Sequence, residues 1–129
     1  MVKPLLYFIP AVIWALIIFF LSTNTPVELG PSHWLDFLSI DKVGHLVFYF
    51  IFCVLVCWGY FKIDKLTLES STTKYILPIL LVVSYGIIME FLQLQFYEGR
   101  QLEFMDMVAN ALGACLGATL FKKFLITRL

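Results

Sequence analysis

Carboxylates, amides and a histidine recur at helical spacing inside stretches of this chain that are otherwise strongly apolar. The pairs that stand out are Asp41 with His45, Glu90 with Gln93, and Asp106 with Asn110. A carboxylate beside an imidazole can transfer protons as a general acid or base, and the same groups can hold a divalent cation. Ionisable groups in apolar helices are expensive to bury, which makes these residues candidates for function.

The composition is that of an integral membrane protein. Hydrophobic residues make up 61% and aromatic residues 17% of the chain, and the mean hydropathy is +0.92, whereas soluble domains are about half apolar and about a quarter charged. A formal net charge of zero provides no basic field for nucleic acid. The cysteines, which are Cys53, Cys57 and Cys115, lie in apolar runs without zinc-type spacing. We therefore predict no nucleic-acid partner and assign no cofactor or resident metal.

Four segments are long enough to cross a hydrocarbon core about 30 Å thick, which takes about 20 helical residues. They run over residues 4–21, 43–61, 75–97 and 104–121. The first is interpreted as a retained helix, since no small-residue cleavage site follows it. Pro78 is expected in the first turn of the third, where a missing N–H donor is tolerated. The predicted fold is a single all-α domain over residues 1–129, a bundle of four transmembrane helices.

The distribution of positive charge predicts the orientation of this bundle. Of the 9 lysine and arginine residues, all but Lys42 and Arg100 flank the N-terminus, the second loop or the C-terminus. The positive-inside rule then places both termini in the cytoplasm. The first outward loop contains the sequence PSHWLDFLSI, a short amphipathic stretch suited to the membrane interface, with Trp34 in the aromatic belt.

Helical geometry, at about 100° per residue, collects the polar residues into stripes. The stripes are Asp41, His45 and Tyr49 on the second helix; Gly86, Glu90, Gln93 and Tyr97 on the third; and Asp106, Asn110, Gly113 and Gly117 on the fourth. The glycines Gly86, Gly113 and Gly117 are predicted to pack helices closely. This topology brings the stripes to one outward face, with a predicted ligand-binding set of Asp41, Lys42, His45, Glu90, Gln93, Arg100, Asp106 and Asn110.

Several of these residues also have a purely structural interpretation. Asp41 and Asp106 could serve as helix N-caps or as favourable charges at helix N-termini, and Lys42 could extend to the lipid head groups. Glu90 fits such an interpretation less well, because it lies in the last turns of its helix, where the macrodipole disfavours an acid. It requires a proton, a bound ligand or a cation, and the outward cations are Lys42, Arg100 and protonated His45.

The order and spacing of these motifs resemble the VanZ-like family over residues 14–117. The matching elements are Leu21-Ser22 with Pro26, Asp41-Lys42-x2-His45, Glu90-x2-Gln93, Arg100 six residues before Asp106, and Asp106-x3-Asn110-x2-Gly113-x3-Gly117. Glu103 departs from the pattern, since a small or polar residue is frequent there. The resemblance implies a small multi-pass protein of the bacterial cytoplasmic (inner) membrane and a role in the cell envelope. The name-giving member is associated with resistance to glycopeptide antibiotics of the teicoplanin type, but the resemblance brings no settled biochemical activity.

Three functions are compatible with these residues. In the first, the outward pocket binds a lipid head group or a lipid-linked cell-wall intermediate, with Arg100 and Lys42 on phosphate and Gln93 and Asn110 in hydrogen bonds. In the second, the protein is an intramembrane enzyme acting on an envelope lipid, by acid–base or metal-assisted chemistry. Its candidate catalytic residues are His45, Glu90 and Asp106, and its candidate cation ligands are Asp41, His45, Glu90 and Asp106. No strong catalytic motif decides this. In the third, Glu90, His45 and Asp106 form part of a proton or ion relay.

Overall fold

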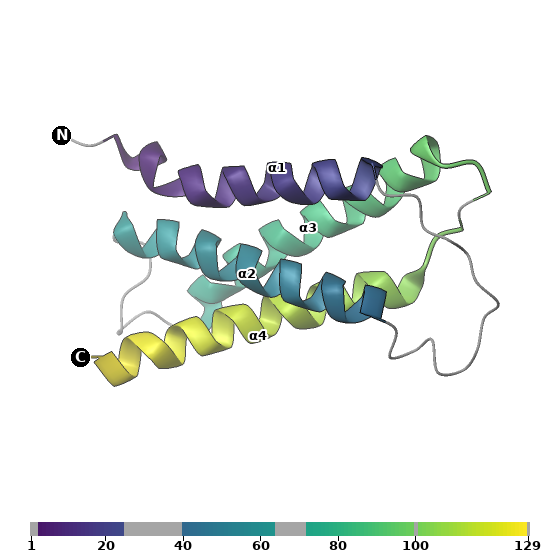
Figure 1. The fold of residues 1–129 in the computed structure, drawn as a ribbon. Coiled ribbons are helices and arrows are strands. Elements are labelled where there is room, and N and C mark those ends of the chain that lie inside the picture. Colours follow the sequence, from purple (N-terminus) through teal and green to yellow (C-terminus); the bar gives the residue numbers. More distant parts are fainter. Residues whose placement is uncertain (1–2, 25–39, 64–71, 100, 129) are drawn as a thin grey trace.

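The computed structural model describes residues 3–24, 40–63, 72–99 and 101–128, and every regular element within them is helical (Figure 1). The elements are the 3₁₀ helix η1 (Pro4–Phe8) and the α-helices α1 (Ile9–Asn24), α2 (Ile40–Lys62), α3 (Thr72–Phe96) and α4 (Phe104–Arg128). Four helical spans of the described chain are long and apolar enough to cross a membrane. The predicted all-helical, four-span architecture is thereby confirmed for these residues.

The helices extend beyond the apolar windows that predicted them. Helix α2 begins at Ile40 rather than near residue 43, and α4 continues to Arg128 rather than ending near residue 121. Asp41 and Asp106 therefore lie in the first turns of their helices, where the macrodipole favours a carboxylate. Hydropathy detects only the part of a helix that suits hydrocarbon, so it misses polar turns that continue past the membrane boundary.

Pro78 does not lie in the first turn of its helix, as we expected from the sequence. Helix α3 begins at Thr72, which places Pro78 inside the helix. Proline has no N–H, so the carbonyl of Lys74 loses its usual donor four residues later. The helix tolerates this loss because the missing bond falls in its first turns, where Lys74 is exposed.

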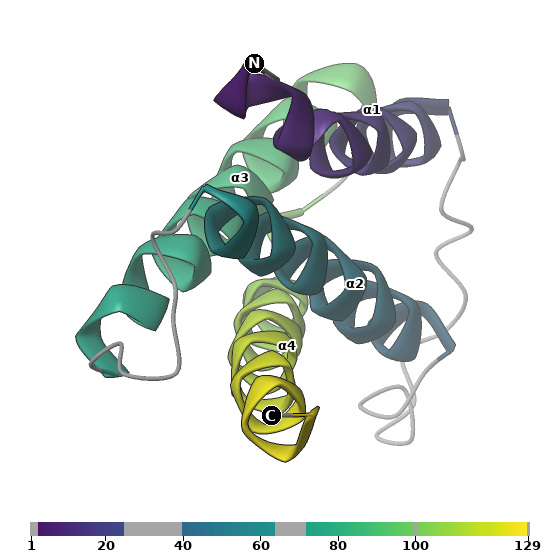
Figure 2. The same ribbon diagram turned by 90° about the vertical axis from the view of Figure 1, so that its left-hand side faces the viewer.

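Helices α2 and α4 form the closest pair in the bundle. A Cβ atom on Gly113 would collide with the backbone carbonyl oxygen of Leu46, and one on Gly117 would lie 2.6 Å from the carbonyl oxygen of Phe50. The two glycines thus let the α2 backbone lie directly on α4, as small residues do at helix interfaces. Helix α1 packs on α2 and α3, on the side of the bundle away from α4 (Figure 2).

The topology gives the bundle two distinct ends. Both chain termini lie at one end, together with the end of α2 and the start of α3 (Figure 1). The start of α2, the end of α3 and the start of α4 lie at the other. Large apolar side chains such as Leu5, Leu16, Phe91 and Phe104 are exposed on the flanks, as expected for surfaces in contact with lipid.

Candidate functional site

The polar residues of the predicted stripes are buried at the end of the bundle away from the termini. Exposed fractions are 2% for Glu90, 5% for Gln93, 0% for Asp106 and 2% for Asn110. Linked side-chain contacts join six residues of α2, α4 and the turn before α4, which we call the polar cluster: Asp41, Lys42, His45, Glu103, Asp106 and Asn110. The spacing of the sequence predicted the convergence of five of these six.

Asp106 connects the two parts of the polar cluster. Its Oδ1 lies 3.2 Å from Lys42 Nζ, while its Oδ2 lies 3.8 Å from His45 Nε2. Lys42 Nζ also donates to Glu103 Oε2 at 3.0 Å. The lysine therefore bridges two carboxylates, and this bridge compensates part of the cost of burying Asp106 completely.

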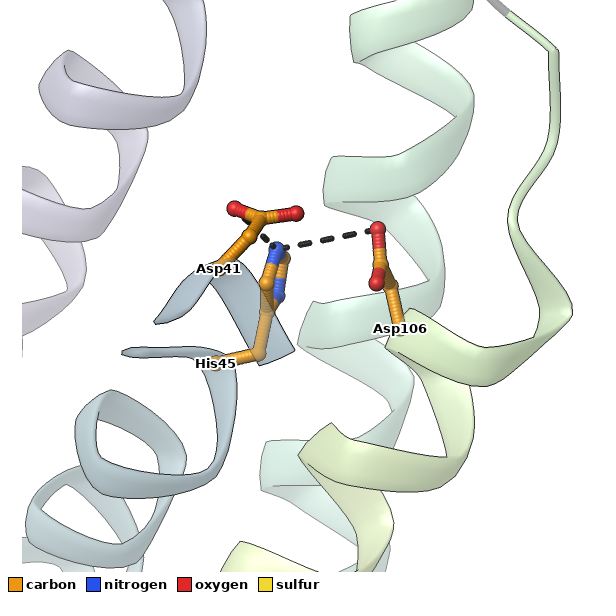
Figure 3. A group of neighbouring side chains, drawn as sticks. All are labelled: Asp41, His45 and Asp106. Atoms are coloured by element: carbon orange, nitrogen blue, oxygen red, sulfur yellow. Dashed lines mark ion pairs between the residues drawn. The ribbon is translucent and has the colours of Figure 1, made fainter. Parts of the chain in front are cut away.

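His45 has different surroundings at its two ring nitrogens. Nδ1 lies 3.0 Å from Asn110 Oδ1, and because this amide oxygen can only accept, Nδ1 carries the hydrogen. Nε2 faces Asp41 Oδ1 and Asp106 Oδ2, each at 3.8 Å (Figure 3). Both distances exceed that of a hydrogen bond. Asn110 thus fixes the ring so that Nε2 points between two carboxylates.

The polar cluster has an excess of negative charge. The carboxylates Asp41, Glu103 and Asp106 face one permanent cation, Lys42, so two negative charges remain when His45 is neutral. Asp41, His45 and Asp106 each offer one ligand atom, and these atoms lie within 4.8 Å of one another. The chemistry of this end is therefore suited to a cation, to proton transfer, or to both.

Helix α3 buries Glu90 and Gln93 inside the bundle. A Cβ atom on Gly86, one turn before Glu90, would lie 2.9 Å from the ring of Tyr49 and 3.0 Å from Asn110 Nδ2. Gln93 Nε2 donates to the backbone oxygen of Ser22 in α1 at 3.2 Å. The predicted stripe thus faces the bundle, and Gly86 leaves room for side chains of the two neighbouring helices.

Two buried amide atoms at this end have no hydrogen-bond partner among the described residues. They are Gln93 Oε1 and Asn110 Nδ2. Most buried polar atoms in proteins are hydrogen-bonded, because an unsatisfied group costs free energy. These two atoms are therefore available to a bound molecule.

The sequence identified most of these residues but not all of their partners. Glu103 was noted only as a departure from a family pattern, yet it contacts Lys42. We expected Lys42 to offset Glu90 or to bind phosphate, whereas its Nζ contacts Glu103 and Asp106. The charge of Glu103, just before the N-terminus of α4, was the one signal that could have suggested this pairing. Arg100 and the amphipathic stretch around Trp34 lie outside the described residues.

Comparisons of the chain with protein-family models, with curated proteins and with solved structures give no match.

Proposed function

We propose that this protein is a VanZ-like, multi-pass protein of the bacterial cytoplasmic membrane that binds a lipid head group or a lipid-linked cell-wall intermediate at its polar end. The charge distribution supports an orientation with both termini in the cytoplasm. Among the described residues, the lysines at the end that carries the termini are Lys3, Lys62, Lys74, Lys122 and Lys123. In this orientation the polar cluster lies at the outer surface, at the level of the head groups.

The unpartnered amides carry the proposal. Gln93 Oε1 and Asn110 Nδ2 are buried and lack partners among the described residues. A head group with hydroxyl and phosphate or carbonyl oxygens supplies both a donor for Gln93 and an acceptor for Asn110. Such a ligand would recover the free energy that these groups lose on burial.

The ion pairs determine which cationic residue remains for phosphate. Lys42 is held by Glu103 and Asp106, so in this proposal it keeps the carboxylates in place. Phosphate contact falls to Arg100, whose planar guanidinium is suited to bidentate contact with phosphate oxygens. This assignment of Arg100 rests on the sequence.

Lipid binding can be tested with two matched glutamines on α3. Gln93 is buried, with one unpartnered amide atom, while Gln95 is exposed on the same helix. We expect Gln93→Ala to weaken binding of phosphatidylglycerol or a polyprenyl phosphate to the purified protein by about 5- to 10-fold, equivalent to one hydrogen bond. Gln95→Ala should leave binding unchanged. Native mass spectrometry of lipid titrations measures both.

Two outcomes would refute the binding proposal. One is equal lipid affinity in wild type, Gln93→Ala and Arg100→Ala. The other is an equal loss of affinity in Gln93→Ala and Gln95→Ala, which would locate the lipid on the outer flank of α3 rather than at the polar end.

The geometry of His45 favours a second candidate function, an intramembrane enzyme that acts on an envelope lipid. Asn110 holds Nδ1, so Nε2 is left to accept a proton, with two carboxylates near enough to stabilise the resulting imidazolium. We expect protein in vesicles to convert a labelled phospholipid and His45→Gln to lose that conversion. Chromatography of the extracted lipids separates the two functions, because a pure binding protein leaves the lipid unchanged.

A further inference from the structure

We propose that Asp41, His45 and Asp106 form a binding site for a divalent transition-metal ion, with Mn²⁺ or Zn²⁺ as the ions that fit. The three residues come from the first two turns of α2 and the first turn of the neighbouring helix α4 (Figure 3). Their ligand atoms are one imidazole nitrogen and two carboxylate oxygens, and all lie within 4.8 Å of one another.

The distances suit an ion between these atoms better than direct contacts. Charge-assisted hydrogen bonds between an imidazolium and a carboxylate are about 2.7 to 2.9 Å long, whereas both carboxylates lie 3.8 Å from Nε2. Two ligands that each lie about 2.1 Å from one ion are separated by roughly 3 to 4 Å. The side chain of Asp41 is 47% exposed, so its carboxylate has room to turn towards an ion.

The residues around the three ligands orient them as outer-sphere partners orient ligands in known metal sites. A metal-binding histidine usually donates its second ring N–H to an oxygen, which fixes the tautomer and the direction of the ligating nitrogen. Asn110 Oδ1 accepts from Nδ1 of His45 in this way. Lys42 holds Oδ1 of Asp106 and so directs Oδ2 towards the histidine. This double orientation is an observation separate from the acidity of the cluster.

Charge and ligand type restrict the ion. A divalent cation neutralises the two negative charges that remain when His45 is neutral, so the ion and the lysine together balance the polar cluster. An imidazole ligand disfavours Ca²⁺ and Mg²⁺, which prefer oxygen ligands, and suits Zn²⁺, while the two carboxylates suit Mn²⁺. Three protein ligands leave at least one coordination position open.

The open position connects the ion to the lipid, and this step rests on the proposed function. The polar cluster alone repels an anionic phosphate, because its carboxylates outnumber its one permanent cation. A bound divalent cation removes this excess of negative charge and can coordinate a phosphate oxygen. The ion then accounts for how an acidic site accepts an anionic head group.

The test is a titration of the intact protein, with any polyhistidine tag removed, with MnCl₂ alone. Electron paramagnetic resonance measures free Mn²⁺, and competition with Zn²⁺ ranks the two ions. We expect one ion per chain, and affinity at least about tenfold weaker in Asp41→Asn and His45→Gln. Asp41 is exposed, so its variant should fold even if His45→Gln does not. Glu98→Gln is the control, because Glu98 is an exposed carboxylate outside the site.

Any other outcome of this titration would contradict the proposed metal site. Wild-type protein without bound Mn²⁺ or Zn²⁺ would overturn it, and so would an Asp41→Asn protein with wild-type affinity. An equal loss of affinity in Glu98→Gln would indicate attraction to surface charge rather than coordination.

Lipid titrations with and without EDTA separate this inference from the proposed function. Lipid binding that requires the ion supports both. Lipid binding that persists in EDTA overturns the role of the ion and leaves head-group binding intact. Specific metal binding in a protein that binds no lipid supports the metal site while the proposed function fails.

Discussion

Helices α2 and α4 pack closely along their length, but the side chains that they bury differ between the two ends of the pair. At one end the pair buries Asp106 and Asn110 and holds the polar cluster together. Towards the other end, the described residues that it buries are small or apolar, among them Cys53, Cys57, Ala114 and Ala118. Here the helices also border an apolar groove of about 620 Å³ beside Trp58. The polar end is expensive to assemble and the apolar half is not, and this cost is the reason why we place the proposed ligand at the polar end.

This contrast also bears on the relay hypothesis. A path for protons or ions needs polar groups through the whole membrane. Within residues 4–21, 46–61, 75–89 and 107–121 there is no Asp, Glu, His, Lys or Arg. A bundle whose described residues bury charge at one end is better suited to capture a ligand at a surface than to move an ion across.

The largest effect on the free energy of unfolding is expected from a substitution where the backbones of α2 and α4 touch. Gly113→Ala places a Cβ atom against the Leu46 carbonyl and 3.0 Å from Phe50 N, so α2 and α4 must separate. We expect a loss of about 3 kcal/mol or more in the free energy of unfolding in mixed micelles. Gly44→Ala is the matched control, because nothing lies within 4 Å of its Cβ position. Equal stability of the two variants would mean that the backbone contact at Gly113 does not hold α2 and α4 together.

The second-largest loss in the free energy of unfolding is expected from a substitution at the polar end. Lys42→Met leaves the fully buried Asp106 without its lysine, and removal of one partner from a buried ion pair costs about 3 kcal/mol. The partial exposure of the Lys42 side chain, at 17%, places the expected loss at or below that figure. Equilibrium unfolding measures this loss, with Lys74→Met, at an exposed lysine, as the control.

A second substitution tests whether the cost comes from an uncompensated charge. Lys42→Met combined with Asp106→Asn removes both charges, so the double variant should be more stable than Lys42→Met alone. If the two losses simply add, Lys42 stabilises the protein through its other partner, Glu103, and not through Asp106.

The sequence predicts features that follow from geometry within one helix better than it predicts contacts between long side chains and other segments. Helical spacing placed Glu90 and Asn110 on buried faces and identified Gly113 as a point of backbone contact, because these features follow from fixed geometry within one helix. Spacing does not determine the partner of a long side chain. Lys42 reaches Glu103, which precedes the neighbouring helix and shares no periodicity with it. Hydropathy detects only the apolar part of a helix, so it misplaced the start of α3, and with it the position of Pro78.

A smaller effect is expected where α1 is attached. Trp14 Nε1 donates to the Phe48 carbonyl oxygen at 2.9 Å, and this bond links α1 to α2 between the two ends. Trp14→Phe should lower the free energy of unfolding by about 1 kcal/mol, as for one hydrogen bond. Trp58→Phe, the same change beside the apolar groove, should cost less. The opposite ranking would show that α1 is held by the apolar half.

The smallest effect is expected in the groove itself. Leu120 lines the groove and is 49% exposed, so in a membrane its side chain contacts lipid as well as protein. Leu120→Ala should therefore change the free energy of unfolding by less than the 2 to 5 kcal/mol typical of a buried leucine. It should leave lipid and Mn²⁺ affinities at wild-type values, because the groove shares no residue with the polar cluster. A loss of either affinity in Leu120→Ala would mean that the two halves are coupled, and that the ligand extends from the polar end into the apolar groove.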